Sequence, residues 1–189
     1  AFFMQTDAVK AVTLEGVDAV MTDVPKVCVS VSTADCIPIL IYDRVHHAVA
    51  AVHAGWRSTV LRIPEAVLQA MAGAYGTRPQ DVEAAIGPGI SLEAFEVGDE
   101  VYEAFRTAGF PMEEIARRYP ATGDGSGRME KWHLDLWQAN RGLLEGCGVP
   151  STRIHLAGVC TYLHSERFFS ARRLGIRSGR ILNGIFLTD

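Results

Sequence analysis

A cysteine and a histidine stand at the ends of two neighbouring apolar stretches of the sequence. Cys36 lies in VSTADCIPIL (31–40), and His53 lies 17 positions further along, in AVHAGWRST (51–59). A thiolate and an imidazole both bind zinc, but this separation is not that of a short zinc-finger motif. From spacing alone, a buried cysteine that packs as a small apolar side chain, beside a hydrogen-bonded histidine, is the commoner interpretation.

Charged residues accompany both side chains. Asp35 directly precedes Cys36, and a carboxylate in that place is able to orient a metal-bound imidazole. Arg57 follows His53 by four residues, where a helix is expected to begin. Its guanidinium, together with the free N–H groups of that helix, would hold an anion such as phosphate. The alternative for Arg57 is a solvated surface charge.

Other candidate residues have weaker support. Cys160 and His164 are four positions apart, which suits a metal pair, but a third ligand is not evident and a loop at a strand end is the simpler interpretation. In FFSARR, either Arg172 or Arg173 is expected to point inward, where it needs an anion or a carboxylate. Glu96 is either a buried carboxylate or a charge at a strand edge. The remaining histidines occupy an expected turn or have no evident partner: His46, His47, His133 and His155.

The elements that must position these residues mix hairpins with helices. Strands are expected over 17–23, 26–36, 38–43, 46–55, 81–87, 153–160, 168–173 and 180–187. Helices are expected from about residue 63 to 73–76, over 98–108 and over 132–148. Pro64 either lies in the first turn of the first helix or kinks it. The polar, glycine-rich stretch 121–131 is expected to be a mobile loop. This order predicts a single α+β domain over residues 1–189 and not a doubly wound parallel sheet.

Composition excludes several classes of protein. A chain of 189 residues with 48% hydrophobic content favours one domain with a sizeable core. Its net charge of −4 provides no basic field for nucleic acid. No apolar run approaches the ~18–20 residues that span a membrane, and no secretory signal is evident. Four cysteines do not make a disulfide scaffold, so a reducing cytoplasm is the expected location.

Five segments of the chain resemble the laccase-domain (YfiH-like) family and occur in the family's order. They are TADCIPIL, AVHAGWR, IGPGIS with AFEVGDEV, HLDLWQANRGLLEGCGV, and CTYLHSERFFSARR followed by SGR. The resemblance covers roughly residues 5–187. It implies mixed β-sheets packed together with flanking helices, and a further N-terminal segment ahead of the residues present here.

The resemblance also implies a metal site with three protein ligands. Two of them, the cysteine of ADC and the histidine of HAGWR, match Cys36 and His53. The family's third ligand is a histidine in a Q-[VT]-H motif, where this chain has Gln5-Thr6-Asp7. Asp7 is then a substituted carboxylate ligand, or the histidine lies in a piece that the sequence lacks. The glycine that usually follows HAGWR is replaced by Ser58.

The activities implied by the resemblance are zinc-dependent and act on purine nucleosides. They are phosphorolysis of adenosine, inosine and methylthioadenosine, and deamination of adenosine, by a monomer or small homo-oligomer. Cys36, His53 and Arg57 would form the catalytic centre. Arg57 would hold phosphate, and Arg172 or Arg173 is the alternative residue for this role. Tyr162 and Phe169 would form an apolar wall for the base.

Two other functions stay open at this point. The family's older description is a copper-dependent oxidase of phenols, so copper is a possible alternative metal. Six histidines are too few for a multicopper centre, which needs many more at close spacing. The second alternative is a metal-stabilised binding module without turnover, which a closed site with four protein ligands would favour.

Overall fold

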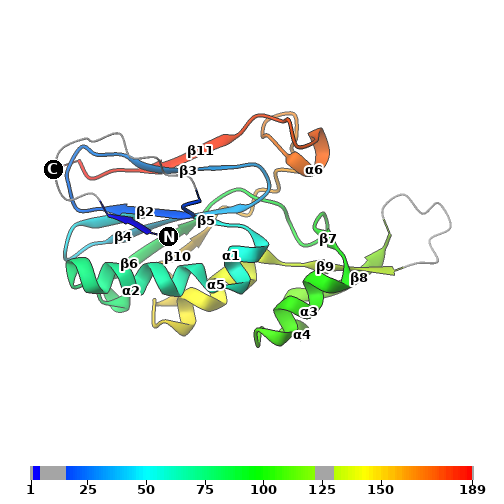
Figure 1. The fold of residues 1–189 in the computed structure, drawn as a ribbon, viewed down its shortest axis with the longest axis horizontal. Helices are drawn as coiled ribbons and strands as arrows, with labels where there is room; N and C mark the ends of the chain where they lie inside the picture. The colour runs from blue at the N-terminus through cyan, green and yellow to red at the C-terminus, as the bar shows by residue number, and fades with distance from the viewer. Residues whose placement is uncertain (1, 5–15, 122–129, 189) are drawn as a thin grey trace.

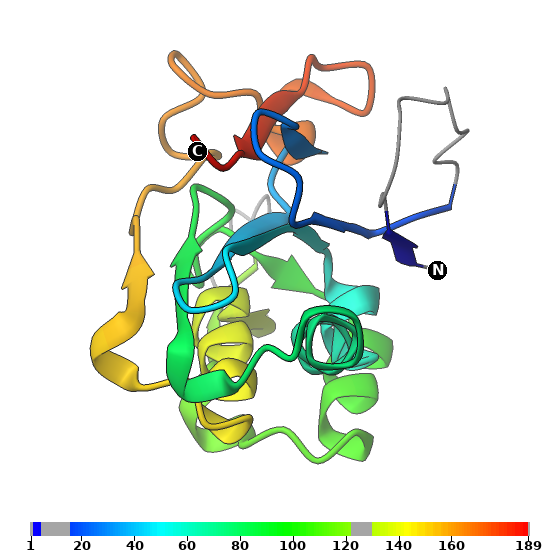
Figure 2. The same cartoon turned by 90° about the vertical axis from the view of Figure 1, so that its left-hand side faces the viewer.

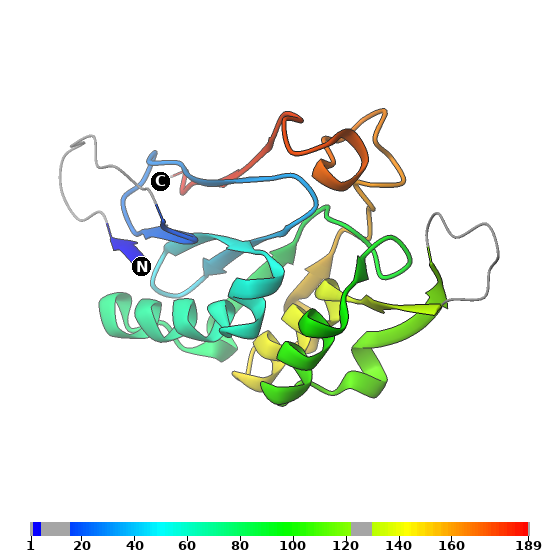
Figure 3. The same ribbon diagram turned by 45° about the vertical axis from the view of Figure 1, so that its right-hand side comes forward.

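Three layers of secondary structure make up the centre of the molecule (Figure 1). The computed structural model describes residues 2–4, 16–121 and 130–188. A six-stranded sheet lies between two long helices on one face and a two-stranded sheet on the other, as the end-on view in Figure 2 also shows. A three-stranded sheet with two short helices extends to one side (Figure 3). The predicted α+β class with mixed sheets is confirmed.

The six-stranded sheet combines parallel and antiparallel pairs. In spatial order its strands are β1 (Phe2–Met4), β2 (Ala19–Thr22), β5 (Ala48–Ala54), β4 (Ile37–Asp43), β6 (Val82–Ile86) and β10 (Ile154–Leu156). The outer pairs β1–β2 and β6–β10 are parallel, and the inner pairs are antiparallel. The expected hairpin of 38–43 with 46–55 is therefore confirmed as β4–β5.

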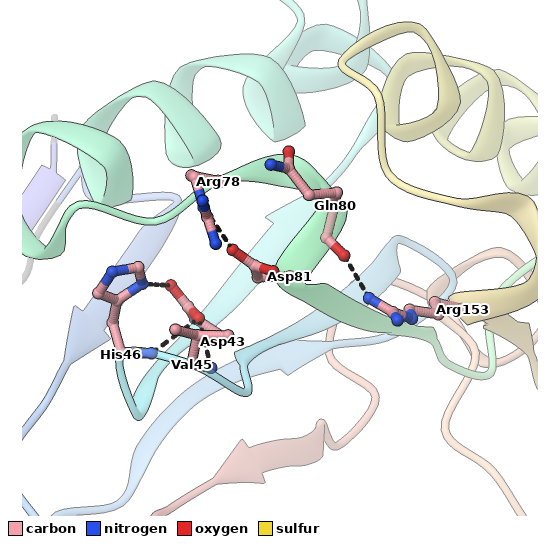
Figure 4. A network of polar contacts seen from close by, with 7 residues as sticks. All are labelled: Asp43, Val45, His46, Arg78, Gln80, Asp81 and Arg153. Atoms are coloured by element: carbon pink, nitrogen blue, oxygen red, sulfur yellow. Dashed lines mark hydrogen bonds and ion pairs between the residues drawn. The ribbon is translucent and has the colours of Figure 1, made fainter.

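A buried carboxylate closes the turn of this hairpin. Asp43, which is fully buried, accepts the backbone N–H groups of Val45 and His46, and its second oxygen lies 2.9 Å from Nδ1 of His46 (Figure 4). At the start of β6, the guanidinium of Arg78 binds the Asp81 carboxylate at 2.7 Å. His46, expected in this turn, is exposed there and also contacts the Asp43 carboxylate.

The two faces of the central sheet have different neighbours because side chains alternate along each strand. Ile37, Ile39 and Ile41 of β4 are fully buried toward the helices, in the larger core. Val49 and Ala51 of β5 face the opposite way, into a smaller core beneath β3 (Val29–Thr33) and β11 (Ile181–Ile185). Val29 and Val31 of β3 are buried in that smaller core, as the alternation in 26–36 predicts.

The helical layer is formed by α2 (Ile63–Tyr75) and α5 (Leu136–Gly146), with the short α1 (Trp56–Val60) joining it to β5. Pro64 lies in the first turn of α2, which settles the choice between a first-turn proline and a kink. Arg62, just before α2, adopts a left-handed conformation with φ of 59° and separates α1 from α2. The helix expected over 98–108 is α3 (Asp99–Thr107).

The start of one predicted helix is misplaced. The helix expected over 132–148 begins only at Leu136, because residues 130–134 form the middle strand β9 of the side sheet. The other strands of that sheet are β7 (Glu96–Val97) and β8 (Ala116–Pro120), and α4 (Met112–Ile115) precedes β8. Asp135 ends β9 and caps α5 by accepting the N–H of Gln138. Of the expected loop, residues 122–129 lie outside the described residues.

The strand expected over 168–173 is not formed. Its last residues instead begin the short helix α6 (Ala171–Leu174), where Ser170 accepts the N–H of Arg173 at 3.1 Å. The two phenylalanines at the start of FFSARR favoured a strand. Ser170, however, is a residue type that commonly caps the first turn of a helix, and it does so here. Among the residues that the structure describes, no helix combines the length and apolar character needed to cross a bilayer.

A buried hydrogen bond joins α1 to α5. Nδ2 of Asn140 donates to Oγ1 of Thr59 at 3.1 Å and to the carbonyl of Leu136 at 2.8 Å, and both polar side chains are fully buried. Asn140 therefore holds in place the helix that follows His53.

We expect Asn140→Ala to lower the free energy of unfolding by about 1–3 kcal/mol, because the Thr59 hydroxyl is left buried without its partner. Urea unfolding measures the change. Gln138→Ala, on the exposed face of the same helix, is the matched control and should stay within about 0.5 kcal/mol. An Asn140→Ala variant as stable as that control would contradict a structural role for the hydrogen bond.

Candidate metal and substrate site

The register of β4 and β5 brings Cys36 and His53 together. Ile37 pairs with Ala54 and Pro38 with His53, so Cys36 lies opposite Gly55 at the end of the hairpin. By alternation both side chains project from the face that carries β3 and β11. A Cβ atom on Gly55 would lie 3.2 Å from Sγ of Cys36 and 3.6 Å from Cε1 of His53. The glycine therefore leaves room where the thiol and the imidazole meet.

The second nitrogen of His53 is held by a carboxylate that the sequence interpretation missed. Nδ1 of His53 lies 3.0 Å from Oδ1 of Asp18, and the backbone N–H of His53 donates to the carbonyl of Asp18 at 2.7 Å. Oδ2 of Asp18 accepts the hydroxyl of Ser58 at 2.9 Å. Only the pairing of β2 with β5 reveals this contact, because 35 positions separate the two residues in the chain.

This arrangement makes His53 a strong base in the metal-free chain. The hydrogen bond with Cys36 raises the pKa of His53 to about 9, with a further contribution from Asp18, although burial acts in the opposite direction. Burial also acts to raise the pKa of Asp18, but hydrogen bonds from His53 and Ser58 outweigh it and lower that pKa. A metal that binds the imidazole must therefore displace a proton from it.

Asp35 does not contact His53, so the expectation that it orients the imidazole is wrong. Its carboxylate instead accepts the hydroxyl of Thr161 at 2.8 Å and the backbone N–H of Arg172 at 2.7 Å. The role expected of Asp35 belongs to Asp18. The error has a simple cause, since neighbours along a strand or turn point in different directions.

Arg57 lies in the first turn of α1 and is exposed. Its guanidinium lies 4.2 Å from the ring centroid of Trp56, a cation–π contact. Its assignment to phosphate stays a prediction.

The other four residues expected to bind substrate lie between β10 and β11. The guanidinium of Arg173 donates to the Tyr162 hydroxyl at 3.3 Å and lies over its ring. The guanidinium of Arg172 donates to the Glu96 carbonyl at 2.9 Å and lies 5.6 Å from the ring centroid of Phe95. Phe169 is 46% exposed and packs against Gly179. Of these residues, Arg172 is linked to the Cys36 turn by the hydrogen bond from its backbone N–H to the carboxylate of Asp35.

An open depression lies beside that link. It has a volume of about 420 Å³ and is lined by Ala34, Asp35, Ile90, Phe95, Ala171, Arg172 and Ile176. A second depression of about 240 Å³ includes His53 in its lining, with residues of β2 and β3. The pair Cys36–His53 therefore lies close to two hollows in the surface.

The other candidate metal residues are separated and have other partners. Cys160 is buried and its sulfur accepts the N–H of Ser91 at 3.3 Å, whereas His164 is exposed near Glu166. His155 pairs with Glu83 at 2.8 Å. Nδ1 of the buried His133 lies 3.1 Å from the Leu92 carbonyl. Each of these histidines therefore has a local contact of its own.

The donor set of the main site suits zinc. Zinc is commonly bound by a thiolate and an imidazole. The second nitrogen of a zinc-bound imidazole usually forms a hydrogen bond with a carboxylate, as His53 does with Asp18. Within residues 2–4, 16–121 and 130–188, no three His, Cys, Asp or Glu side chains lie close enough to hold a metal together. The third ligand that the resemblance implies is not among the described residues, and Asp7, expected in that place, lies outside them.

Known proteins are similar to this chain over most of its length. A purine nucleoside phosphorylase from Bacteroides thetaiotaomicron is 53% identical over 174 residues, which cover 92% of this chain and 62% of the relative. Adenosine deaminase RL5, from an unknown prokaryotic organism, is 46% identical over 173 residues, which cover 92% of this chain and 63% of the relative. The chain thus spans about three fifths of the length of these relatives.

Solved structures share the fold. The Bacillus licheniformis hypothetical protein YfiH matches with a TM-score of 0.80 and 31% identity over 90% of this chain and 61% of its own. YlmD from Geobacillus stearothermophilus matches with a TM-score of 0.78 and 32% identity over 92% of this chain and 62% of its own. The family described as multi-copper polyphenol oxidoreductase laccase matches residues 3–188. The chain therefore belongs to this laccase-domain family, together with YfiH and YlmD.

Proposed function

We propose that this chain carries the site of a zinc-dependent purine nucleoside enzyme. Its reactions are the phosphorolysis of adenosine, inosine and methylthioadenosine and the deamination of adenosine, with purine nucleoside and phosphate as substrates. The observation that supports this most is that the Cys36 thiol and the His53 imidazole lie together beside Gly55. In addition, Asp18 contacts Nδ1 of the imidazole. The names of the relatives, which include a phosphorylase and a deaminase, support the choice of substrate.

Each residue of the candidate site is assigned one role in this proposal. Cys36 and His53 hold the zinc ion, and Asp18 fixes the orientation of the imidazole. When bound, zinc supplies Lewis-acid activation of water or of the substrate near neutral pH. Phosphorolysis additionally needs a cation for phosphate as it displaces the base from the ribose carbon, and Arg57 is assigned to it. Tyr162 and Phe169 offer aromatic surface to the base.

The two alternative functions are less well supported by the donors present. A multicopper oxidase needs clustered histidines, whereas His46, His133, His155 and His164 each have a separate local contact. A binding module without turnover would hold its metal with four protein ligands, but the described residues provide two at this point. A site that kept one coordination position open would favour catalysis.

We expect Cys36→Ser to lose most of the zinc, because the hydroxyl is a far weaker ligand than a thiolate. Elemental analysis of the purified protein measures the metal per chain. Cys28→Ser, at an exposed position in the same part of the sequence, is the matched control and should keep the metal. A Cys36→Ser variant with a full equivalent of zinc would remove Cys36 from the ligand set.

We expect Asp18→Ala to weaken zinc binding about 10–100-fold, the range typical for loss of a carboxylate that orients a ligating histidine. Competition with a chromophoric chelator measures the affinity. In the unsubstituted chain the affinity should rise as pH increases toward 9, because the proton on His53 competes with the metal below its pKa of about 9. The comparison is therefore made at pH 9, with the exposed Asp23→Ala as control. Equal affinities at pH 9 would disprove the orienting role.

We expect Arg57→Ala to lower kcat/KM for phosphorolysis ~100-fold, or ~3 kcal/mol, if it resembles loss of one charge-stabilising group. Adenosine deamination should fall much less, because it needs no phosphate. Arg57→Lys should recover part of the loss, since the ammonium keeps the charge but not the paired hydrogen bonds. Arg44→Ala, in the exposed β4–β5 turn, is the control. Equal losses in both reactions would transfer the phosphate role to Arg172 or Arg173.

A further inference from the structure

Three segments far apart in the sequence meet at the turn that carries Cys36. The backbone carbonyl of Asp35 accepts the N–H of Ile90 at 2.8 Å. Gly89 in turn donates to the carbonyl of Val159 at 3.1 Å and accepts the N–H of Thr161 at 2.9 Å. The junction is tight, because a Cβ on Gly89 would lie 2.4 Å from Cδ1 of Ile37. The Cys36 turn, residues 89–91 and the segment after β10 therefore form one packed unit.

Asp35 is the side chain that ties this unit to α6. It is only 8% exposed, and its backbone has a φ of 82°, a left-handed conformation that few residues other than glycine, asparagine and aspartate adopt. Oδ1 accepts the hydroxyl of the fully buried Thr161, and Oδ2 accepts the N–H of Arg172 at the start of α6. One carboxylate thus bridges two points of the chain that lie 11 residues apart.

The segment that Asp35 holds carries the residues assigned to substrate. Arg172 is fixed at its backbone by Asp35 and at its guanidinium by the Glu96 carbonyl, and it lines the 420 Å³ depression together with Phe95 and Asp35. Tyr162 follows Thr161 directly, and its hydroxyl accepts a hydrogen bond from Arg173. Without the carboxylate, the backbone bonds of Gly89 would remain, but the Thr161 hydroxyl and the start of α6 at Arg172 would lose their links to the turn that carries Cys36.

We propose that Asp35 is a positioning residue, whose carboxylate fixes residues 161–172, with Tyr162 and Arg172, against the strand end that carries Cys36. The proposal rests on the proposed function for its consequence in catalysis, and on the hydrogen bonds alone for its structural part. It assigns Asp35 no contact with metal or substrate. The negative charge of Asp35 is therefore not required, whereas its two hydrogen-bonding atoms are.

Two substitutions separate position from charge. Asp35→Ala removes both acceptors. Asp35→Asn keeps the shape, because the amide oxygen is able to accept the N–H of Arg172 while the amide NH₂ donates to the Thr161 hydroxyl, which also accepts. Asparagine is also among the residues that tolerate the left-handed conformation. The amide should therefore replace the carboxylate if its role is to position the segment.

Hydrogen–deuterium exchange of the unsubstituted chain and the two variants tests the structural part without any substrate. In Asp35→Ala, peptides covering residues 161–174 should exchange at least about tenfold faster, while peptides of β4 keep their protection. Asp35→Asn should return the exchange of 161–174 to within about threefold of the unsubstituted chain. Faster exchange throughout the sheet, or no change in 161–174, would overturn the proposal by showing a general loss of stability or no bridge.

Steady-state kinetics on zinc-replete protein tests the catalytic part. Asp35→Ala should raise KM for inosine at least about tenfold with a smaller change in kcat and no loss of zinc, and Asp35→Asn should recover most of this change. Equal damage from both substitutions would show that the charge itself is needed, which contradicts a positioning role. If the unsubstituted chain has no activity on nucleosides, the proposed function fails, while the exchange experiment still decides whether Asp35 fixes the segment.

Discussion

The antiparallel register of β4 with β5 is the constraint on which the candidate site depends. It places His53 opposite Pro38 and the position of Cys36 opposite Gly55, so two residues 17 positions apart share one end of one hairpin. The hairpin is held in this register by burial on both faces. Ile39 of β4 and Val49 of β5 are fully buried, one toward the helices and the other toward β3. A shift by one residue would exchange these faces and separate the thiol from the imidazole.

Two aspartates form hydrogen bonds around the Cys36–His53 pair, and each has different partners. Asp18, which directly precedes β2, contacts Nδ1 of His53, and the imidazole also forms a hydrogen bond with Cys36. Asp35, from the turn between β3 and β4, takes no part in that contact and holds the segment that leads to α6. Under the proposed function, Asp18 would therefore support the histidine ligand of the metal, and Asp35 the segment that carries Tyr162 and Arg172.

The two-stranded sheet gives the site its second wall. Cys36, His53 and Asp18 all belong to the face of the central sheet that β3 and β11 cover, and residues of β3 line a depression with His53. The helices on the opposite face contribute the larger core and carry Arg57 at the start of α1. The helices therefore cover one face of the sheet, while Cys36 and His53 lie on the other, beside the depression lined by β2 and β3.

By itself, the sequence determined the α+β class, the β4–β5 hairpin, the helix that begins with Pro64 in its first turn, and Cys36 with His53 as the residues of interest. These features follow from local periodicity, from breakers such as proline and glycine, and from motifs read in order along the chain. Where the local signal was ambiguous the prediction failed. Residues 130–134 continue smoothly into α5 by hydrophobicity but pair as a strand, and FFSARR has the composition of a strand but ends in α6.

Only the tertiary structure decided which side chains the carboxylates of Asp18 and Asp35 contact. Asp35 is adjacent to Cys36 in the chain, yet its turn directs the side chain toward Thr161 and Arg172. Asp18 lies 35 positions before His53 and reaches it through the pairing of β2 with β5. The physical reason is that hydrogen bonds between side chains depend on strand register and on the direction of each Cα–Cβ bond, and neither quantity is contained in local composition.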